Sequence, residues 1–447
     1  MSNIKPSLKR TLISETVNWV DQTVLIKGWV RIRRDHGRLI FLDIRDRSGI
    51  VQVVVNPKVS ESSYAVAQTL RPEFVVEIIG EVNKRPQGTI NRDLPTGEIE
   101  IEAKIITVLS KAETLPFDMG GELNLELPTL LDHRSLTLRH PKVESIFKVQ
   151  AKILEGFRIA AEEFDCTEIV VPTIVASATE GGAELFEVKY YDHKAYLSQS
   201  PQLYKQMMVP VFERVWTISK AYRAEPSVTT RHLSETMQLD FELGFVTFEE
   251  LMDTLEEVAV KMFRHVEKTC PFVDRIGIGK IPRLTIREAQ EVIYKEFGRD
   301  NSKEKDLSPQ DEIDICKWAK DRYKSDLVTI THFPTTAKPF YIMPDPNNPE
   351  YSLSYDLLFK GVEILSGGQR VHVYDQLIKA IKDRGMNPKV FEMYLMAFKY
   401  GMPPEGGFSF GLERITMKLL GLSNIREASL FPRDMERVDE KLSENKD

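Results

Sequence analysis

The fold is decided by Tyr222-Arg223-Ala224-Glu225 and by Thr230-Arg231-His232-Leu233-Ser234-Glu235, which follows after a short connection. These residues place arginines, glutamates and a histidine around a turn, and a further arginine lies far downstream in Gly411-Leu412-Glu413-Arg414. Two arginines that meet in one cleft can hold opposite ends of a bent triphosphate, because each guanidinium presents a planar fork of donors. The sequence contains no Gly-x-x-x-x-Gly-Lys-Ser loop, which excludes a P-loop. The pattern therefore predicts ATP activation without a P-loop.

The bulk composition indicates a soluble protein of two or three domains. The chain has 447 residues, of which 42% are hydrophobic and 28% charged, so it can bury large cores. The start Met1-Ser2-Asn3-Ile4-Lys5 lacks the apolar core of a signal peptide, and we expect a cytoplasmic protein. Cys166, Cys270 and Cys316 lack metal-ligand spacing, which favours buried thiols in a reducing compartment over zinc binding or catalysis.

The first quarter of the chain predicts a small β-barrel. From Thr23 to about Val108 the pattern reads as strand throughout, with β-branched runs broken by Gly, Asp and Pro at residues 24–30, 39–44, 50–55 and 74–79. Short strands at this spacing are typical of a barrel. The formal net charge of -7 argues against nucleic-acid binding, but six arginines gather between Arg31 and Arg47. A solvated mixed-charge surface is the alternative interpretation of these arginines.

A change of pattern follows a linker at residues 112–118. Apolar residues recur at helical spacing between Val143 and Phe164, and Ile169-Val170-Val171-Pro172 then predicts a strand that ends in proline. An ordinary amphipathic helix explains the first part equally well. Later segments alternate strands with helices such as 248–266, so we expect an α+β body.

Two acidic residues in the later part are candidates for holding a cation. Asp356 and Glu363 lie seven residues apart, a spacing that can bring both carboxylates to one side of a hairpin. Oxygen ligands of this kind suit Mg²⁺ that bridges phosphates. The alternative interpretation is two exposed acids on a strand pair without a bound cation. The segment that follows, Ser366-Gly367-Gly368-Gln369-Arg370, disfavours this alternative.

These motifs, in this order, resemble the class II aminoacyl-tRNA synthetases of the aspartyl, asparaginyl and lysyl subgroup, and most closely the aspartyl enzymes of compact archaeal-type build. The resemblance covers almost the whole chain. It implies an OB-fold anticodon-binding domain at residues 1–108, a hinge at 109–131 and a catalytic domain at 132–447 built on an antiparallel sheet flanked by helices. The helix, strand and proline at 143–172 resemble motif 1, which implies a homodimer. The implied activity is the joining of aspartate to tRNA(Asp) with ATP and Mg²⁺.

The resemblance also implies roles for individual residues. The predicted aspartate contacts are Glu180, Gln202, Lys205, Arg223, Asp240, Ser366 and Arg370. The predicted ATP contacts are Arg223 at the α-phosphate, Arg414 at the γ-phosphate, Arg231 at the outer phosphates, and Ala224, Glu225, His232, Leu233, Glu363, Gly411, Leu412 and Glu413. The predicted metal ligands are Asp356, Glu363 and Ser366, and the predicted tRNA contacts are Arg34, His36, Phe41, Gln52 and Gly88.

Charge is the feature that predicts aspartate as the amino acid. A buried side-chain carboxylate needs cations, and those cations would be left unpaired by a neutral asparagine. Lys205 and Arg370 match the residues that hold this carboxylate in aspartyl enzymes, and the asparaginyl pattern lacks the lysine. No Ser/His/Asp or Cys/His nucleophile set is needed, because positioning and the phosphates carry the chemistry. Phe41 has a second interpretation, as a core residue of the barrel.

Three positions depart from the family pattern. Thr236 stands where many relatives carry an aromatic residue under the adenine, Ser409 replaces a glycine of motif 3, and Glu405 replaces the usual histidine. Glu405 adds a negative charge near the predicted substrate. His36 and Gly88 are the residue types found in relatives with relaxed anticodon choice, which predicts that tRNA(Asn) is also a substrate.

Two rival functions remain open at this point. The first is an ATP-dependent aspartate-amidating enzyme on the same catalytic fold, which the intact N-terminal barrel disfavours. The second is a non-catalytic RNA-binding relative, which the retained Arg223, Glu363, Arg370 and Arg414 disfavour.

Overall fold

The computed structural model describes residues 8–176, 185–225 and 229–438. Contacts divide the chain into two compact units, Met1–Asp132 and His133–Asp447, and each is described here by itself. The predicted finer division at residues 108 and 131 stays a prediction.

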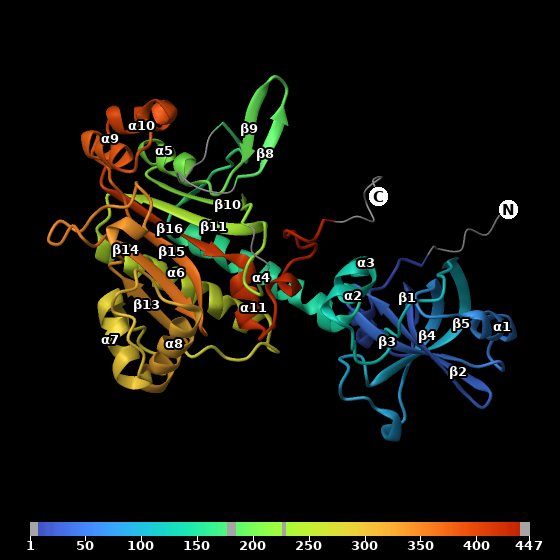
Figure 1. Ribbon diagram of the computed structural model, residues 1–447. Helices are drawn as coiled ribbons and strands as arrows, with labels where there is room; N and C mark the ends of the chain where they lie inside the picture. Colours follow the sequence, from blue (N-terminus) through green and yellow to red (C-terminus); the bar gives the residue numbers. More distant parts are fainter. Residues whose placement is uncertain (1–7, 177–184, 226–228, 439–447) are drawn as a thin grey trace. The chain divides into compact units, whose positions relative to one another are not determined.

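The first unit is a closed five-stranded barrel, as the sequence predicts (Figure 1). Its strands are hydrogen-bonded to one another in the order β1-β2-β3-β5-β4. Their bounds are β1 (Thr23–His36), β2 (Leu39–Asp46), β3 (Gly49–Val55), β4 (Val75–Lys84) and β5 (Ile99–Ser110). Strand β2 shows why the barrel forms, because Ile40, Leu42 and Ile44 are buried while the residues between them face outward. The barrel core is built from such alternating positions.

One prediction for this unit is wrong. The region from Thr23 to Val108 is not strand throughout, because helix α1 (Glu61–Thr69) lies between β3 and β4. Its N-cap is Ser60, whose side chain accepts a hydrogen bond from the backbone N–H of Ser63. The helix then buries Ser63 and Ala67, two small side chains that a search for β-branched runs passes over.

The second unit is built on an eight-stranded sheet in the order β12-β13-β14-β15-β16-β11-β10-β6 (Figure 1). Pairs are antiparallel except β12 with β13 and β10 with β6. The bounds are β6 (Thr167–Glu168), β10 (Arg214–Tyr222), β11 (Glu235–Gly244), β12 (Arg283–Thr285), β13 (Leu327–Thr331), β14 (Ser354–Phe359), β15 (Val362–Gln369) and β16 (Glu405–Gly411). A small second sheet contains β7 (Ile174–Val175), β9 (His193–Leu197) and β8 (Glu187–Tyr190). This α+β architecture confirms the predicted fold class.

Helices complete both units. Their bounds are α2 (Leu127–Asp132), α3 (Arg134–Thr137), α4 (Pro141–Glu163), α5 (Gln202–Phe212), α6 (Phe248–Thr269), α7 (Ile286–Phe297), α8 (Pro309–Tyr323), α9 (Tyr374–Asp383), α10 (Glu392–Lys399) and α11 (Leu412–Leu419). Helix α4 begins with proline in its first turn, and α6 begins with a capping box between Thr247 and Glu250. Both helices contribute to the largest core of the unit, which includes Phe157 of α4.

The predicted strand at residues 169–172 is wrong by two residues. Strand β6 is Thr167–Glu168, parallel to β10 at the edge of the sheet. The N–H of Ile169 still donates to the carbonyl of Trp216, at 2.9 Å, but Val170 is 96% exposed. The chain leaves the sheet ahead of Pro172, which has no N–H for a ladder bond.

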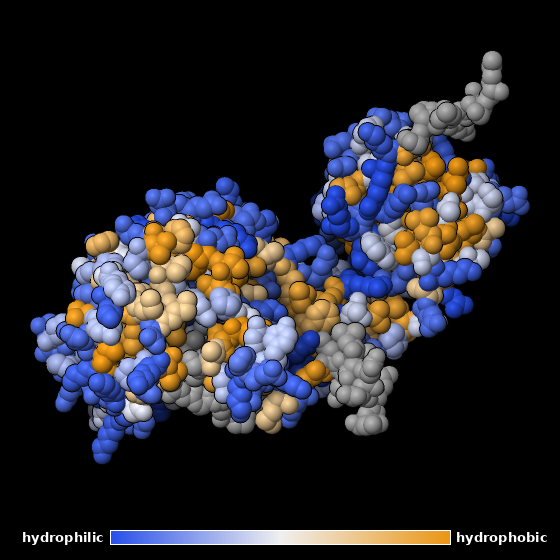
Figure 2. Space-filling model, turned by 90° about the horizontal axis from the view of Figure 1, so that it is seen from above, coloured by the Kyte–Doolittle hydropathy of each residue, from blue (hydrophilic) through white to orange (hydrophobic). Residues whose placement is uncertain are grey.

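Hydrophobic side chains interrupt an otherwise largely hydrophilic surface in patches on both units (Figure 2). Among the described residues, no helix combines the length and apolar character that crossing a membrane requires.

Candidate active site

Strand β11 separates the core of the second unit from its site. Leu239, Phe241 and Leu243 belong to the hydrophobic core. The alternate residues Asp240 and Glu242 are also buried, at 1% and 0% exposure, but they are acidic and point to the opposite face. Cross-strand partners share a face, and Asp240 pairs with Ser409, Ser409 with Ser366, and Ser366 with Asp356. The register therefore aligns four polar residues across four strands.

Helix α5 supplies the amide and ammonium groups that meet this face. Gln202, Lys205 and Gln206 stand at positions i, i+3 and i+4, which puts them on one side of the helix, and all three are buried. The ammonium of Lys205 lies 2.9 Å from Asp240 Oδ1 and 3.1 Å from Glu242 Oε2. Asp240 Oδ2 has no hydrogen-bond partner among the described residues, which leaves one buried acceptor for a ligand.

The two predicted carboxylate-binding cations share one acid. Arg370, which directly follows β15, places Nε 2.7 Å from Glu242 Oε1. Its Nη2 donates to Glu242 Oε2 at 3.2 Å and to Gln202 Oε1 at 3.3 Å. Glu242 thus holds Lys205 and Arg370 side by side, although they are 165 residues apart in the chain (370 minus 205). Their convergence agrees with the prediction, and their role as substrate ligands stays a prediction.

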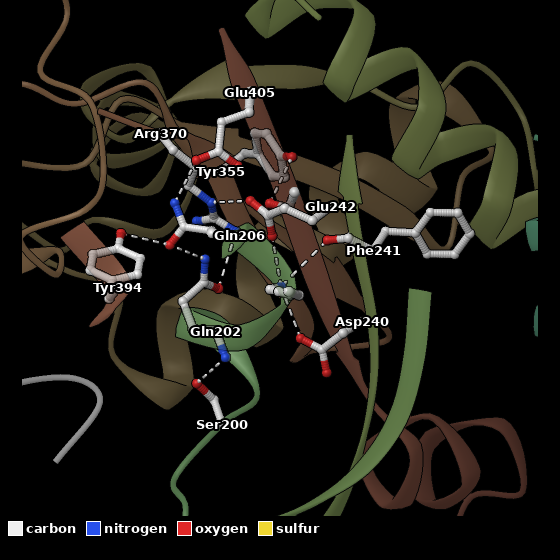
Figure 3. A network of polar contacts seen from close by, with 12 residues as sticks. Ser200, Gln202, Gln206, Asp240, Phe241, Glu242, Tyr355, Arg370, Tyr394 and Glu405 are labelled. Carbon is white, nitrogen blue, oxygen red and sulfur yellow. Dashed lines mark hydrogen bonds and ion pairs between the residues drawn. The ribbon is translucent and has the colours of Figure 1, made fainter. Parts of the chain in front are cut away.

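Lys205, Asp240, Glu242 and Arg370 form a buried charged cluster. Further polar side chains extend this cluster through a ring of hydrogen bonds (Figure 3). Gln206 Oε1 accepts from Gln202 Nε2 at 2.9 Å and from the hydroxyl of Tyr394 at 3.0 Å. Its Nε2 donates to Glu405 Oε1 at 2.7 Å. The backbone N–H of Arg370 donates to the carbonyl of Glu405 at 2.9 Å, which closes the ring.

Glycine at position 407 is required by this cluster. A Cβ there would lie 2.3 Å from Glu242 Oε2 and 2.2 Å from the carbonyl oxygen of Phe241. Backbone at such a distance cannot move aside without breaking the β11–β16 pairing. Gly407 therefore leaves the space beside β16 that the carboxylate of Glu242 occupies.

A cavity of about 330 Å³ opens beside the cluster. It is lined by Lys205 and Arg370 together with the predicted phosphate-binding Arg223, Arg231 and Arg414. Its wall also contains the predicted residues Gln202, Glu225, His232, Leu233, Asp240, Glu363, Ser366, Gly411 and Glu413, and the two departures Thr236 and Ser409. The structure therefore brings most of the predicted substrate and ATP residues into one cavity. Ala224 and Leu412 are neighbours in sequence of lining residues, and Glu180 lies outside the described residues.

The three arginines predicted to bind phosphate differ in how firmly they are held. Arg223 is about half exposed, with Nη1 3.8 Å from Glu225 Oε1. Arg414 Nη1 donates to the carbonyl of Glu363 at 3.0 Å. Arg231 Nη1 lies 2.8 Å from Glu312 Oε2 on α8, so a phosphate would share this guanidinium with Glu312. Among the described residues, Arg223 has the longest of these contacts, so it is the arginine that the protein holds least firmly.

Two acids near this end, the partly buried Glu312 and the buried Glu413, have raised pKa values. Burial, and secondarily the charge of Glu363, raises the pKa of Glu312 to about 7. Burial also raises the pKa of Glu413 to about 7, although both its oxygens accept from the N–H of Met237 at 3.1 and 3.2 Å. Desolvation lowers the pKa of His232, whose Nδ1 lies 2.6 Å from the hydroxyl of Thr229. This end of the cavity therefore carries less negative charge at neutral pH than its composition indicates.

The predicted metal ligands lie on the hairpin of β14 and β15. Asp356 is buried, and both its oxygens accept from the ammonium of Lys338, at 2.9 and 3.1 Å. Burial, and secondarily the charge of Glu363 against the opposing attraction of Lys338, raises the pKa of Asp356 to about 6. A buried carboxylate beside a second one fits a cation, and Lys338 supplies one here. The described residues hold no group of three or more His, Cys, Asp or Glu suited to a metal, so phosphate and water would have to complete a Mg²⁺ shell.

The predicted tRNA residues lie in the first unit, mostly on one outer face of the barrel. Phe41 is only half-buried, on the side of β2 opposite the core, which excludes its interpretation as a core residue. It pairs with Arg34 on β1, and the ring of His36 meets it edge-on with centroids 6.0 Å apart. Gln52 Nε2 donates to Glu100 Oε2 at 3.0 Å. Gly88 lies in a separate 3₁₀ turn, Gln87–Thr89, where an added Cβ would meet no atom within 4 Å.

Sequence reasoning missed several residues that the structure adds to these sites. They are Glu242, Gln206, Lys338 and Glu312 in the second unit and Glu100 on the barrel. Period-2 alternation with Asp240 was a signal for Glu242, and helical spacing from Gln202 was one for Gln206. Glu312 on α8 lies 81 residues from Arg231, and Lys338 lies in a loop 18 residues before Asp356, so neither offered a local signal.

Comparison with known proteins agrees with this geometry. Residues 126–435 match the family tRNA synthetases class II (D, K and N), and residues 24–109 match the OB-fold nucleic acid binding domain. The chain belongs to this family of class II tRNA synthetases, which confirms the resemblance seen in the motifs.

Individual relatives are similar over nearly the full length. The aspartate–tRNA(Asp) ligase of Pyrococcus horikoshii is 40% identical, with 95% of this chain and 98% of that protein covered. The aspartate–tRNA(Asp/Asn) ligase of Thermus thermophilus is 41% identical, with 96% and 99% covered. Among solved structures, asparaginyl-tRNA synthetase from Pyrococcus horikoshii complexed with asparaginyl-adenylate matches with a TM-score of 0.88 and 31% identity, over 96% of this chain and 99% of that one.

Proposed function

We propose that this chain is an aspartate–tRNA ligase that forms aspartyl-adenylate and diphosphate from L-aspartate and ATP, then transfers aspartate to tRNA(Asp). The observation that carries the proposal is the convergence of Lys205 and Arg370 on one wall of the cavity. Among the described residues, the side-chain hydrogen bonds of the Arg370 guanidinium use Nε and Nη2, which leaves Nη1 for a substrate carboxylate. Ligase names among relatives of about 40% identity support the same conclusion.

The first step joins two anions, so the site must reduce their repulsion and align them. The substrate's α-carboxylate attacks the α-phosphorus, an acyl–phosphate bond forms, and diphosphate leaves. Arg223 would bind the α-phosphate and Arg414 the γ-phosphate, which holds the nucleotide at both ends. The open Oδ2 of Asp240 would accept from the substrate's ammonium group, a role that Glu180 is predicted to share. Ser366 and Gln202 would complete the amino-acid contacts.

Magnesium would be held by Asp356 and Glu363, with Ser366 nearby on β15. When bound, the ion supplies positive charge to the phosphates during displacement. The ammonium of Lys338 would have to release Asp356 for the carboxylate to reach such an ion.

The second step needs no side-chain nucleophile, because a ribose hydroxyl of the terminal adenosine attacks the mixed anhydride and AMP leaves. The barrel would bind the anticodon through Phe41, Arg34 and Gln52, with unpaired bases stacking on the aromatic ring. Glu100 joins this set through its hydrogen bond to Gln52.

We also propose tRNA(Asn) as a second substrate, a homodimer built on α4, and a cytoplasmic location.

Phe41→Ala is expected to raise KM for tRNA about tenfold, because stacking of one base on an aromatic ring contributes about 1–3 kcal/mol. Aminoacylation kinetics at varied tRNA concentration would measure this. The matched control is Ile105→Ala, which shortens an apolar side chain elsewhere on the barrel, 53% exposed on β5. A Phe41→Ala enzyme with unchanged KM for tRNA would remove the anticodon role from this face.

Two assays separate the proposed function from its rivals. Aspartate-dependent exchange of pyrophosphate into ATP is expected, and its absence would favour a non-catalytic RNA-binding protein. Product formation that depends on tRNA and not on ammonia separates a ligase from an amidating enzyme. Charging of purified tRNA(Asp) and tRNA(Asn) transcripts then decides the tRNA set, and a tRNA(Asn) left uncharged would refute the second substrate.

A further inference from the structure

Glu405 is a buried acid without a cation of its own. It stands at the start of β16 and is 0% exposed. Its Oε1 accepts from Gln206 Nε2 at 2.7 Å, while Oε2 has no hydrogen-bond partner among the described residues. Within the described part of the chain, the nearby Lys205 and Arg370 make their ion pairs with Asp240 and Glu242 instead. An ionised carboxylate here would be buried and unpaired, so the neutral acid is strongly favoured.

With Asp240 and Glu242 both ionised, the charges around Glu405 balance in that neutral form. Lys205 on α5 and Arg370 after β15 are positive, and Asp240 and Glu242 on β11 are negative. Tyr394 on α10 and Tyr355 on β14 are further titratable neighbours, and burial raises the pKa of both phenols, which are therefore neutral. The ring of Tyr341 lies beside the guanidinium of Arg370. Burial, and secondarily repulsion by Glu242, raises the pKa of Glu405 well above its ordinary value. Ionisation of Glu405 would leave one excess negative charge beside the cations that are proposed to bind a substrate carboxylate.

A continuous set of hydrogen bonds joins Glu405 to the guanidinium of Arg370 (Figure 3). Because Gln206 Oε1 already accepts from Gln202 and Tyr394, its Nε2 is fixed toward Glu405. Gln202 Oε1 in turn accepts from Arg370 Nη2. Glu405 itself does not line the cavity, so it can act on a substrate only through these neighbours.

We propose that Glu405 is a positioning residue for amino-acid selection: its neutral carboxyl keeps the buried cluster without net charge, and its ionisation weakens binding of aspartate. The inference rests on the proposed function, because it takes aspartate as the substrate. Glutamine is the matched substitution, since it keeps the shape and the acceptor for Gln206 but cannot ionise. The effect belongs to KM for aspartate and not to kcat.

The test is KM for aspartate against pH, measured by pyrophosphate exchange in the wild type and in Glu405→Gln. Aspartate affinity should be full below the pKa of Glu405 and fall above it, so that log KM of the wild type rises with pH by up to about one per unit, the limit for one proton. Glu405→Gln should match the wild type within about twofold at low pH and lack this rise. KM for ATP should not separate the two enzymes at any pH. Glu267→Gln, which neutralises a carboxyl bonded to the N–H of Ile276, should keep the wild-type slope.

Failure of this inference can be told from failure of the proposed function. A wild type without aspartate-dependent exchange refutes the function. Three results in an active enzyme would overturn the role of Glu405. The first is a wild-type KM for aspartate that does not change with pH, and the second is an equal rise of KM with pH in Glu405→Gln. The third is a KM for aspartate of Glu405→Gln more than tenfold above that of the wild type at low pH. If Glu405→Gln does not fold, calorimetry of aspartate binding to the wild type in buffers of different ionisation enthalpy decides. Proton uptake in the pH range where KM rises is expected, and its absence overturns the inference.

Discussion

Arg370→Met is expected to lower kcat/KM for aspartate roughly a thousandfold, or about 4 kcal/mol, because truncating one partner of a buried charge pair costs about 2–5 kcal/mol. The loss has two sources. The substrate carboxylate loses one of its two cations, and Glu242, at 0% exposure, keeps Lys205 as its one ion-pair partner among the described residues. KM for ATP should change less than about threefold, since Arg370 is bonded to Glu242 and Gln202 and is none of the three arginines predicted to bind the phosphates. Steady-state pyrophosphate exchange at varied aspartate and ATP measures both values.

Arg370→Lys is the matched control for this experiment. It keeps the positive charge but loses the planar fork that bonds Glu242 and Gln202 together, so we expect an intermediate loss. Thermal unfolding must accompany both variants, because a broken buried pair also costs about 3–5 kcal/mol of stability. A folded Arg370→Met enzyme with kcat/KM for aspartate within tenfold of the wild type would contradict the assignment.

Arg223→Ala is expected to lower kcat of pyrophosphate exchange about a thousandfold, with a much smaller rise in KM for aspartate, which Arg223 is also predicted to contact. A guanidinium aimed at the reacting phosphate stabilises charge that develops in the transition state, and removing one such donor costs about a hundred- to a thousandfold in kcat. Arg223 is about half exposed and lies 3.8 Å from Glu225, so the fold does not depend on it. The effect should therefore appear in the rate and not in the unfolding temperature.

Arg214→Ala provides the comparison. Arg214 begins β10, the strand that Arg223 directly follows, and at 40% exposure it is about as exposed as Arg223. It lies 3.9 Å from Glu213 and also donates to the carbonyl of Phe164 at 3.3 Å. It does not line the cavity, and its removal should leave kcat unchanged. Equal losses in the two variants would indicate a general effect of surface charge and would refute the α-phosphate role.

Much of the fold follows from local patterns. The barrel strands were predictable because residues such as Ile40, Leu42 and Ile44 alternate with outward-facing ones, and period-2 alternation reflects burial on one side. Helix α1 was missed because its buried side chains are small, and a capping serine is a weak signal beside long β-branched runs. The end of β6 depended on where the chain leaves the sheet edge, which tertiary contacts determine.

Those site residues that lie in a recognisable sequence motif were predictable. Lys205, Arg223, Arg370 and Arg414 were each identified from their own segment, and the structure places all four in one cavity. Their partners were not predictable, because pairing across the sheet determines them. Glu405 meets Gln206, and Glu242 lies over Gly407, only because β11 and β16 pair with Gly244 opposite Glu405. From sequence, Glu405 was an added negative charge near the substrate; in the structure, its burial favours the neutral acid.

The most direct test of the proposed selection of aspartate is a crystal structure with a non-hydrolysable aspartyl-adenylate analogue. The analogue's side-chain carboxylate is expected about 2.7–3.2 Å from both the ammonium of Lys205 and the guanidinium of Arg370. Its phosphate is expected at Arg223. A side-chain carboxylate bound elsewhere, for instance by Lys338, with Lys205 and Arg370 still engaged only with Asp240 and Glu242, would contradict the proposal.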